Sequence, residues 1–248
     1  MMKHIIVVMI LVASLAFTFQ SVSAADVTGA VDLNSAYVWR GMTLNDGWVA
    51  QPSIDIAKGG FDLNVWGNFD MDDYDDRLDS GEFSEVDLTA SYGFTVGMVD
   101  LRVGYIEYLF PTTDAGGAPG TRELFANAGM DLAAGFAVSL DVYRDIDELK
   151  EWYTSLGLTY SYAVSEKLSL GAGASMAWAG DDYCSDGSAG FYDYNLSISA
   201  GYVITPEWSV SAFIKYTDAL DSDNLADKDD GGSLDVKTYG GVGVTYTF

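Results

Sequence analysis

Charged side chains recur at every second residue along many segments of this chain, and most of them are acidic. Carboxylates held on one face of an extended segment attract cations and repel anions. Basic residues are fewer on the same faces, where aromatic residues also occur. The candidate pore-lining residues defined in this way are Arg40, Asp32, Asp55, Asp62, Trp66, Asp87, Arg102, Asp141, Tyr143, Asp193 and Lys215.

Two scarce residue types limit the chemistry. The single histidine, His4, lies in a segment that we expect to be removed, so Ser-His-Asp and Cys-His catalysis and imidazole-bound zinc are excluded. Cys184 is the single cysteine and cannot form a disulfide within the chain. We therefore expect no enzyme, no cofactor and no metal site. An outer-membrane phospholipase, the nearest enzymatic alternative, needs a Ser-His arrangement.

Residues 1–24 resemble a secretory signal peptide, with Lys3, an apolar run and small residues before a cleavage site at Ala24-Ala25. The alternative is an uncleaved membrane anchor, but no basic flank follows the run. Cleavage leaves one domain of 224 of the 248 residues, at 25–248. Losing Lys3 leaves 11 basic against 37 acidic residues, a net charge of −26, which excludes nucleic acid as a partner.

Apolar and polar residues alternate with a period of two over most of the chain, as in half-buried strands. The segment "FDLNVWGNFD" shows this pattern, with Phe61, Leu63 and Val65 opposite Asp62 and Asn64. Twelve strands are predicted, at 26–42, 49–57, 61–71, 85–94, 99–110, 123–132, 136–145, 151–162, 168–179, 191–202, 208–218 and 235–248.

These strands are long, and their connections alternate in length. Each predicted strand has roughly 9–16 residues, as expected for tilted strands that cross a bilayer, whereas strands of soluble proteins usually have about 5–6 residues. Short links such as "KGG" alternate with acidic loops such as "DDYDDRLDSGEFS". We therefore predict a closed antiparallel transmembrane β-barrel, all-β, with both termini in the periplasm. A secreted soluble β-sandwich or barrel is the alternative.

Aromatic residues are sorted by height on the apolar face, as in the interfacial belts of membrane barrels. The expected outer belt is Tyr37, Trp39, Trp48, Phe69, Trp152, Trp178, Tyr192, Tyr194 and Tyr216. The expected inner belt is Phe94, Phe136, Tyr160, Tyr162, Tyr202, Trp208, Tyr246 and Phe248. Outer-membrane lipid is therefore an expected partner.

The final stretch "GVGVTYTF" predicts that the last strand pairs with the first, because hydrocarbon cannot satisfy free backbone amides. A terminal Phe248 also resembles the signal that the barrel-assembly machinery reads in outer-membrane proteins.

An acidic, hydrated lumen predicts passage of cations and exclusion of anions. The alternative is a structural plug of ion pairs. Against it, the predicted inward face carries twelve acids but only four bases, Arg40, Arg102, Lys215 and Lys237. The inward aromatic residues allow two further interpretations, a stacking track for sugars or nucleosides or a simple narrowing of the mouth. They are Trp66, Tyr108, Phe125, Tyr143, Tyr153, Phe191, Phe213 and Tyr239.

The acidic loops offer oxygen ligands of the kind that Ca²⁺ prefers. The loop "DSDNLADKDDGG" does not match the EF-hand spacing, because Leu225 stands where a third ligand is needed. Solvated loops are the simpler expectation, and Cys184 is expected to be an unpaired thiol in one of them.

The stretch "NSAYVWRGMTLNDG" resembles the S-D-Y-V-F-R-G opening of the TorF family of porin-like bacterial proteins of otherwise unknown function. Ala36 departs from the family's Asp, so the resemblance carries over only Arg40, as a pore-facing charge. The alternative is that Arg40 pairs with an inward carboxylate for structure. The sequence thus predicts an outer-membrane channel for small hydrophilic solutes, biased toward cations; the alternative is a non-conducting structural or adhesive barrel. Oligomeric state stays open.

Overall fold

The computed structural model describes residues 25–75, 78–112 and 118–248. Within them, twelve long strands form one closed antiparallel barrel, and two short strands form a separate hairpin. The barrel strands are β1 (Asp26–Asn34), β4 (Val49–Lys58), β5 (Phe61–Asp70), β6 (Phe83–Val96), β7 (Val99–Phe110), β8 (Ala118–Asp131), β9 (Phe136–Asp145), β10 (Trp152–Ala163), β11 (Leu168–Ala179), β12 (Gly190–Val203), β13 (Trp208–Ala219) and β14 (Thr238–Thr247). The predicted fold class is confirmed.

The barrel closes between its first and last strands. β1 and β14 are antiparallel, with Thr28 opposite Thr247 and Asn34 opposite Gly241. The backbone N–H of Phe248 donates to the carbonyl of Val27 at 3.0 Å, so pairing continues to the last residue. A closed sheet leaves no free edge, which is what spanning a bilayer requires.

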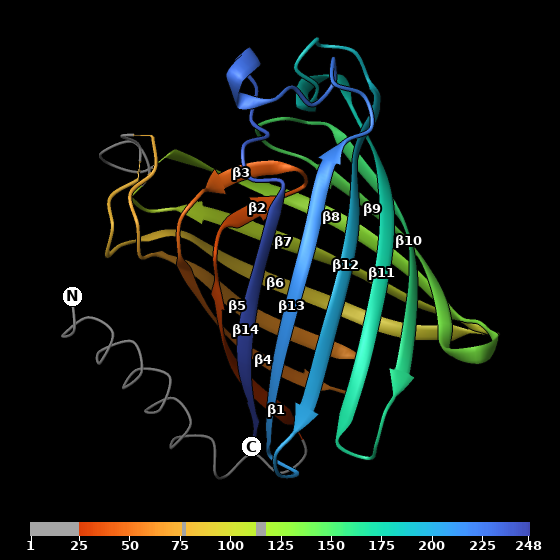
Figure 1. The fold of residues 1–248 in the computed structure, drawn as a ribbon. Coiled ribbons are helices and arrows are strands. Elements are labelled where there is room, and N and C mark those ends of the chain that lie inside the picture. Colours follow the sequence, from red (N-terminus) through yellow and green to blue (C-terminus); the bar gives the residue numbers. More distant parts are fainter. Residues whose placement is uncertain (1–24, 76–77, 113–117) are drawn as a thin grey trace.

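The two ends of the barrel differ, as the loop lengths predict (Figure 1). Asp26 and Phe248 lie at the end with the short connections, which we call the turn end. The opposite end, the loop end, carries the long connections and the short helices η3 (Asp181–Tyr183) and η4 (Lys228–Asp230). A third short helix, η2 (Ala133–Gly135), forms a connection at the turn end. The predicted signal peptide at 1–24 lies outside the described residues.

The outward face is apolar, and its aromatic residues pair across strands at the turn end. Phe61, which is 67% exposed, packs on Tyr92 with 4.7 Å between ring centroids. Trp208 and Tyr246 form a similar pair at 4.7 Å, and Tyr246 also contacts Phe248. Cross-strand aromatic pairs stabilise a sheet by roughly 0.2–1 kcal/mol each.

The inward face differs from one wall to the other. Toward the turn end of β9 to β12 it is built of small residues, and glycines face serines across strands. A Cβ on Gly157 or Gly171 would lie 2.5 Å from a serine hydroxyl oxygen. On β4 to β8 the inward residues are larger and polar or aromatic, including Gln51, Asn68, Glu85 and Tyr108. In the described part of the chain no helix is long and apolar enough to cross a membrane.

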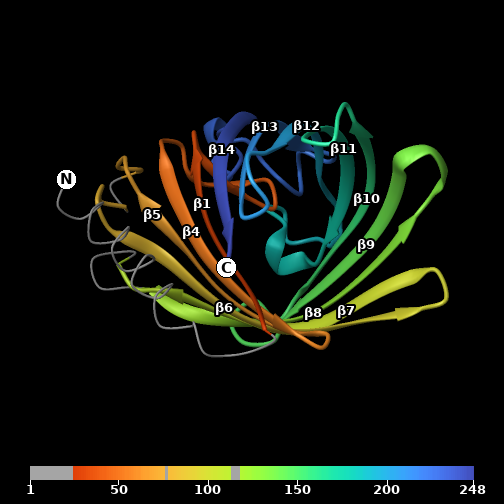
Figure 2. The same ribbon diagram turned by 90° about the horizontal axis from the view of Figure 1, so that it is seen from below.

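The two short strands lie inside the ring. They are β2 (Tyr37–Trp39) and β3 (Met42–Asn45), and we call them together the lumen hairpin. Figure 2, a view along the barrel, shows this hairpin and the segment around η3 within the circle of strands. The prediction of a single strand over 26–42 is wrong beyond Asn34, because the chain leaves the wall there and folds into the lumen.

Candidate functional site

The turn of the lumen hairpin explains why the chain folds back at this point. Trp39 pairs with Met42, so Arg40 and Gly41 alone form the turn. Their φ angles are 49° and 77°. Two consecutive residues with positive φ make the tight turn that matches the twist of paired strands. Glycine adopts this conformation without strain, whereas Arg40 does so at a cost of roughly 1–3 kcal/mol.

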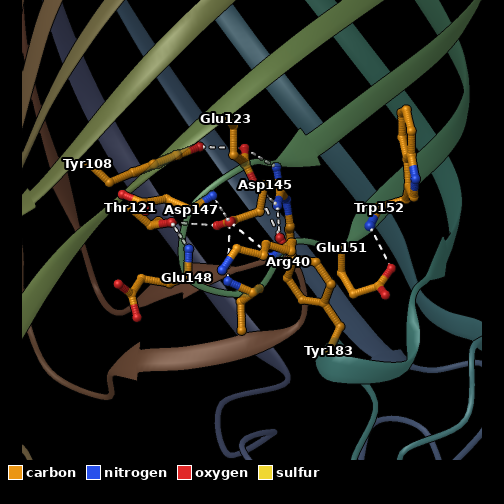
Figure 3. Close-up of polar contacts among 12 residues, drawn as sticks. Arg40, Tyr108, Thr121, Glu123, Asp145, Asp147, Glu148, Glu151, Trp152 and Tyr183 are labelled. Carbon is orange, nitrogen blue, oxygen red and sulfur yellow. Dashed lines mark hydrogen bonds and ion pairs between the residues drawn. The ribbon is translucent and has the colours of Figure 1, made fainter.

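That strained backbone places Arg40 against the opposite wall of the barrel (Figure 3). Its Nη1 and Nη2 donate to the two carboxylate oxygens of Glu123 on β8, at 2.6 and 2.8 Å. Nη1 also donates to the hydroxyl of Tyr183, at 2.7 Å. The side chains of Arg40 and Glu123 are 7% and 1% exposed. A bidentate pair with both charges buried is geometrically specific and costly to break.

Aromatic rings enclose this ion pair. The guanidinium carbon of Arg40 lies 4.2 Å from the ring centroid of Trp39, and 4.5 Å from those of Tyr143 and Tyr153. Such distances permit cation–π attraction, which is stronger where water is excluded. Of the two alternatives for Arg40, the structure shows pairing with an inward carboxylate. Trp39 was predicted in the outer aromatic belt, and this is wrong because its segment lies in the lumen.

The hairpin is one part of a larger packed unit at the loop end. Leu225 and Leu234, from the loop between β13 and β14, are buried with Tyr153, Tyr183 and Tyr192 in one cluster. The turn of the hairpin sits directly on this cluster, since a Cβ on Gly41 would lie 2.5 Å from Cδ2 of Leu225. The lumen along β10 to β12 is therefore filled by protein at this end.

Along β6 to β8 the loop end instead keeps a cavity of about 240 Å³, which we call the loop-end chamber. Aromatic residues from the hairpin and from the barrel wall line it, together with aliphatic side chains and one buried carboxyl group. Its lining comprises Tyr37, Trp39, Met42, Leu44, Leu78, Ser84, Glu85, Tyr108, Phe110 and Thr121. Tyr37 was also predicted in the outer belt and lies in the lumen instead.

A layer of polar side chains continues beneath this chamber toward the turn end. Trp66 packs against Tyr37, with 5.6 Å between ring centroids. Asp87 follows Glu85 two positions later along the inward face of β6, so their carboxyl groups are neighbours on that face. One oxygen of Asp87, Oδ1, is buried and has no hydrogen-bond partner among the described residues.

The next cavity, the turn-end chamber, has a volume of about 270 Å³ and a mainly polar lining. It contains three of the predicted site residues, Asp55, Arg102 and Tyr143. Arg102 donates to Asp62 at 2.5 Å, and Asn64 donates to Asp55 at 2.9 Å. The complete lining is Asp55, Asn64, Thr89, Arg102, Ile106, Phe125, Asn127 and Tyr143.

The remaining predicted residues are spread around the ring. Asp141 accepts a hydrogen bond from Asn127 at 2.8 Å, beside the turn-end chamber. Asp193 is fully buried and accepts hydrogen bonds from Tyr153 and Asn195, and Lys215 lies over the ring of Tyr239. Asp32 on β1 lies against Gly243 on β14. The structure thus brings only part of the predicted set together.

The role of Asp145, which was predicted among the inward acids, is to hold the β9–β10 connection. It accepts the hydroxyl hydrogen of Thr121 at 2.6 Å and three backbone N–H groups, those of Asp147, Leu149 and Lys150, at 2.9 to 3.1 Å (Figure 3). A carboxylate surrounded by backbone donors orders a connection and is not free to meet a solute.

Strand β12 contains an irregularity that reverses the predicted faces at its start. Met176 pairs with Tyr194 but Trp178 pairs with Phe191, so β12 has an extra residue there. Phe191, predicted inward, is exposed on the outside, while Tyr192, predicted in the outer belt, is buried inside. A bulge shifts the period of two by one residue, and a sequence pattern does not reveal it.

Sequence reasoning missed the partners of Arg40. Glu123 lies on the predicted inward face of its strand. The alternation of inward and outward residues therefore indicated that Glu123 faces the lumen, but did not identify it as the partner of Arg40. Tyr183 lies in a loop without periodicity, so no sequence pattern predicts that it reaches into the lumen.

Two lysines form ion pairs with acidic residues in and beside the long loops. Lys228 lies 2.8 Å from Asp75 and 2.9 Å from Asp235, and Lys237 lies 3.0 Å from both Asp218 and Asp227. Parts of two predicted loops, at 76–77 and 113–117, lie outside the described residues. Glu151, Asp181 and Asp182 bring their carboxylate oxygens within 4.8 Å of one another, but exposed acids gather in this way without an ion.

Cys184 is a free thiol in the connection between β11 and β12, as predicted, and it is buried in the cluster with Tyr183. Burial raises the pKa of its thiol, so it is less reactive than an ordinary surface cysteine.

Comparisons with known proteins agree with this architecture. Three solved structures share the fold: the COG4313 outer membrane channel from Pseudomonas putida F1 (TM-score 0.56, 16% identity, covering 93% of this chain and 98% of that one), the KdgM porin in complex with disordered oligogalacturonate (0.54, 11%, 90% and 99%) and the NanC porin (0.53, 11%, 91% and 100%). At such identities the likeness shows the fold. A search of curated proteins found no match.

A family model matches most of the chain, over residues 19–230. It does not carry the TorF name that the motif around Arg40 suggests; its description is "Bacterial protein of unknown function (Gcw_chp)". The chain therefore belongs to the Gcw_chp family of bacterial proteins, within an architecture that it shares with outer-membrane porins.

Proposed function

We propose that this protein is an outer-membrane channel for the passive diffusion of small hydrophilic solutes, with a bias toward cations. The observation that carries the proposal is the polar turn-end chamber inside a closed barrel whose outer surface is apolar. Carboxyl groups exceed basic groups around it, since Asp32, Asp55, Asp62 and Asp141 face the same lumen as Arg102. An excess of carboxylates lowers the energy of a cation in a narrow aqueous path and raises that of an anion.

The same arrangement supports an outer-membrane location. Aromatic side chains occupy the outward face at the turn end, with aliphatic residues such as Leu158 and Ile198 exposed nearer the middle. This order is typical of a surface in contact with lipid. In that location the turn end faces the periplasm and the long loops face outside. The terminal Phe248 supports delivery by the barrel-assembly machinery.

The route that we propose passes beside the lumen hairpin. The wall formed by β6 to β8 carries the loop-end chamber, and the turn-end chamber lies below it on the same wall. The opposite side is filled by the cluster around Tyr183 and Leu225. A solute entering from the loop end would therefore meet the aromatic chamber first and the carboxylates second.

One of the structures that share the fold is the KdgM porin in complex with disordered oligogalacturonate, a sugar chain that carries carboxylates. The acidic lumen of the present chain argues against a solute of that charge. A small cation or a neutral polar molecule suits these side chains better.

The packed unit at the loop end favours a second candidate function. If the hairpin and loops close the lumen fully, the protein would be a non-conducting barrel that acts in envelope structure or adhesion through its loops. The number of side chains committed to this packing, including the buried Arg40–Glu123 pair, is the observation in its favour.

One experiment separates the two functions. Purified protein is inserted into a planar lipid bilayer under a tenfold gradient of potassium chloride. Stepwise conductance with a reversal potential of cation sign is expected for the channel. A reversal potential of anion sign would contradict the cation bias, and a folded but silent protein would support the structural role.

A further inference from the structure

We infer that the loop-end chamber is a binding site for small organic amines, molecules that join an apolar body to an ammonium group. This inference deepens the proposed function by naming a solute class, and it depends on that function only for its physiological meaning. The chamber lies at the loop-end entrance of the proposed route and is separate from the turn-end chamber.

The walls of the chamber supply the apolar half of the recognition. Tyr37, Trp39, Tyr108 and Phe110 contribute four aromatic rings, and Met42, Leu44 and Leu78 contribute aliphatic surface. A volume of about 240 Å³ suits a molecule of the size of one substituted ring. Burial of an apolar body there is favourable by roughly 25 cal/mol per Å² removed from water.

Carboxyl groups at the inner end of the chamber supply the charged half of the recognition. Glu85, which is 4% exposed, lines the chamber, and Asp87 lies directly beneath it on the same strand. Tyr37 lines the chamber together with Glu85, so the ring of Tyr37 and the carboxyl group of Glu85 face the same space. The chamber lining, as far as the described residues define it, contains no lysine or arginine.

Neither of these two carboxyl groups is paired with a lysine or arginine among the described residues, whereas other buried acids of the lumen have a cation or hydrogen-bond donors. Glu123 is bound by Arg40, Asp62 by Arg102, and Asp193 accepts two hydrogen bonds. The charged groups that act on Asp87 are Glu85 and Glu123, both acidic, and its Oδ1 has no hydrogen-bond partner within the described chain. Glu85 is buried and Asp87 is half-buried, and two carboxyl groups held in this way without a cation are stabilised by one. An ammonium group would supply both the charge and the N–H donors.

The aromatic walls and the carboxyl pair together select a narrow class of ligand. An inorganic cation has no apolar body to bury against the walls of the chamber, and a neutral apolar molecule leaves the carboxyl pair without a cation. An ammonium ion with an apolar body satisfies both, because its charge is also attracted to the faces of the surrounding rings. Anions are disfavoured by Glu85 and Asp87 together.

Three probes that share a phenyl ring test the inference: benzylamine as the cation, benzyl alcohol as its neutral counterpart of similar shape, and benzoate as the anion. Binding to the full-length barrel in detergent is measured by isothermal titration calorimetry at pH 7. Benzylamine is expected to bind at one site, at least tenfold more tightly than benzyl alcohol, and benzoate is expected not to bind. Equal binding of benzylamine and benzyl alcohol, or no binding of either, would overturn the inference.

Variants assign the binding to the chamber. Glu85→Gln is expected to weaken benzylamine binding at least tenfold and to leave benzyl alcohol unchanged. The matched control is Asp131→Asn, which removes an inward carboxylate from the turn end of β8, and it is expected to bind benzylamine as the parent does. Equal losses in both variants would show a general effect of lumen charge and overturn the site.

Folding of Glu85→Gln is checked by the heat-dependent gel shift of folded barrels. A second variant tests the same site independently, in case Glu85→Gln does not fold. Leu78→Lys replaces an aliphatic lining residue in the loop between β5 and β6 with one that carries an ammonium group. It is expected to abolish benzylamine binding, and unchanged binding would overturn the site. Because calorimetry does not require conduction, a silent barrel that binds benzylamine would refute the channel and keep the amine site.

Discussion

The two ends of the lumen treat charge in opposite ways. At the loop end, the buried Arg40 and Glu123 form a bidentate pair enclosed by aromatic rings. At the turn end, Asp62 and Arg102 also pair, but their side chains are partly exposed beside a polar chamber. The first pair is removed from water and the second is not, so one lumen combines a packed half around Arg40 with a more open half around Arg102.

This difference has an energetic basis. Removing one partner of a buried pair leaves an uncompensated charge in a medium of low polarity, whereas an exposed pair contributes about 0–1 kcal/mol. The packed half should therefore control the stability of the barrel and the access of reagents to the loop-end cluster. The open half should control the preference for cations. The predictions below test this division.

The largest effect is expected for Arg40→Ala. It leaves Glu123 buried without its cation, so the free energy of unfolding in lipid vesicles should fall by about 3–5 kcal/mol. Guanidinium unfolding followed by tryptophan fluorescence measures this change. The double variant Arg40→Ala/Glu123→Gln should recover part of the loss, because it removes the orphaned charge. A loss below about 1 kcal/mol in the single variant would show that the pair contributes as an exposed pair does.

A smaller loss of stability is expected for Gly41→Ala. The new methyl group would lie 2.5 Å from Leu225 and 3.0 Å from Asp193, at a φ of 77°. We expect about 2–3 kcal/mol of destabilisation from strain and overlap together. Gly231→Ala is the control, because its φ is 84° but a Cβ there meets nothing within 4 Å. It should cost only about 1 kcal/mol, and equal losses in both would place the whole effect in the backbone.

Labelling of Cys184 reports the opening of the packed half directly. Burial raises the pKa of its thiol, so less thiolate is present at pH 7.5 and alkylation by iodoacetamide should be slow in the parent protein. Arg40→Ala should speed the reaction roughly tenfold, if removing the ion pair loosens the cluster by about 1.4 kcal/mol. Mass spectrometry of timed samples measures the rate. An unchanged rate would mean that the cluster holds without Arg40.

The smallest effect is expected in the open half. Asp55→Asn keeps an oxygen for the hydrogen bond from Asn64 and removes one charge from the turn-end chamber. The free energy of unfolding should change by less than about 1 kcal/mol. The cation preference in the reversal-potential measurement should fall modestly. Asp186→Asn, in an exposed loop, should leave the preference unchanged, and an equal fall there would assign selectivity to surface charge.

The alternation of side chains was sufficient to predict the barrel. The ends of β9 and β11 agree with the predicted strands, and the pairing of the chain ends follows from "GVGVTYTF". A period of two fixes which face each residue occupies as long as the strand is regular. The candidate site was harder to predict from the sequence, because the residues that meet in the lumen come from connections as well as from strands.

The sequence by itself determined a closed sheet with an apolar outside and an acidic inside, since period and strand length are local properties. The tertiary structure alone decided that the chain turns inward after Asn34, that Arg40 meets Glu123 83 positions later in the chain, and that β12 shifts by one residue. The physical reason is that a buried charge is stabilised by whichever partner the fold brings near it. That partner lies across the lumen, where no local pattern reaches.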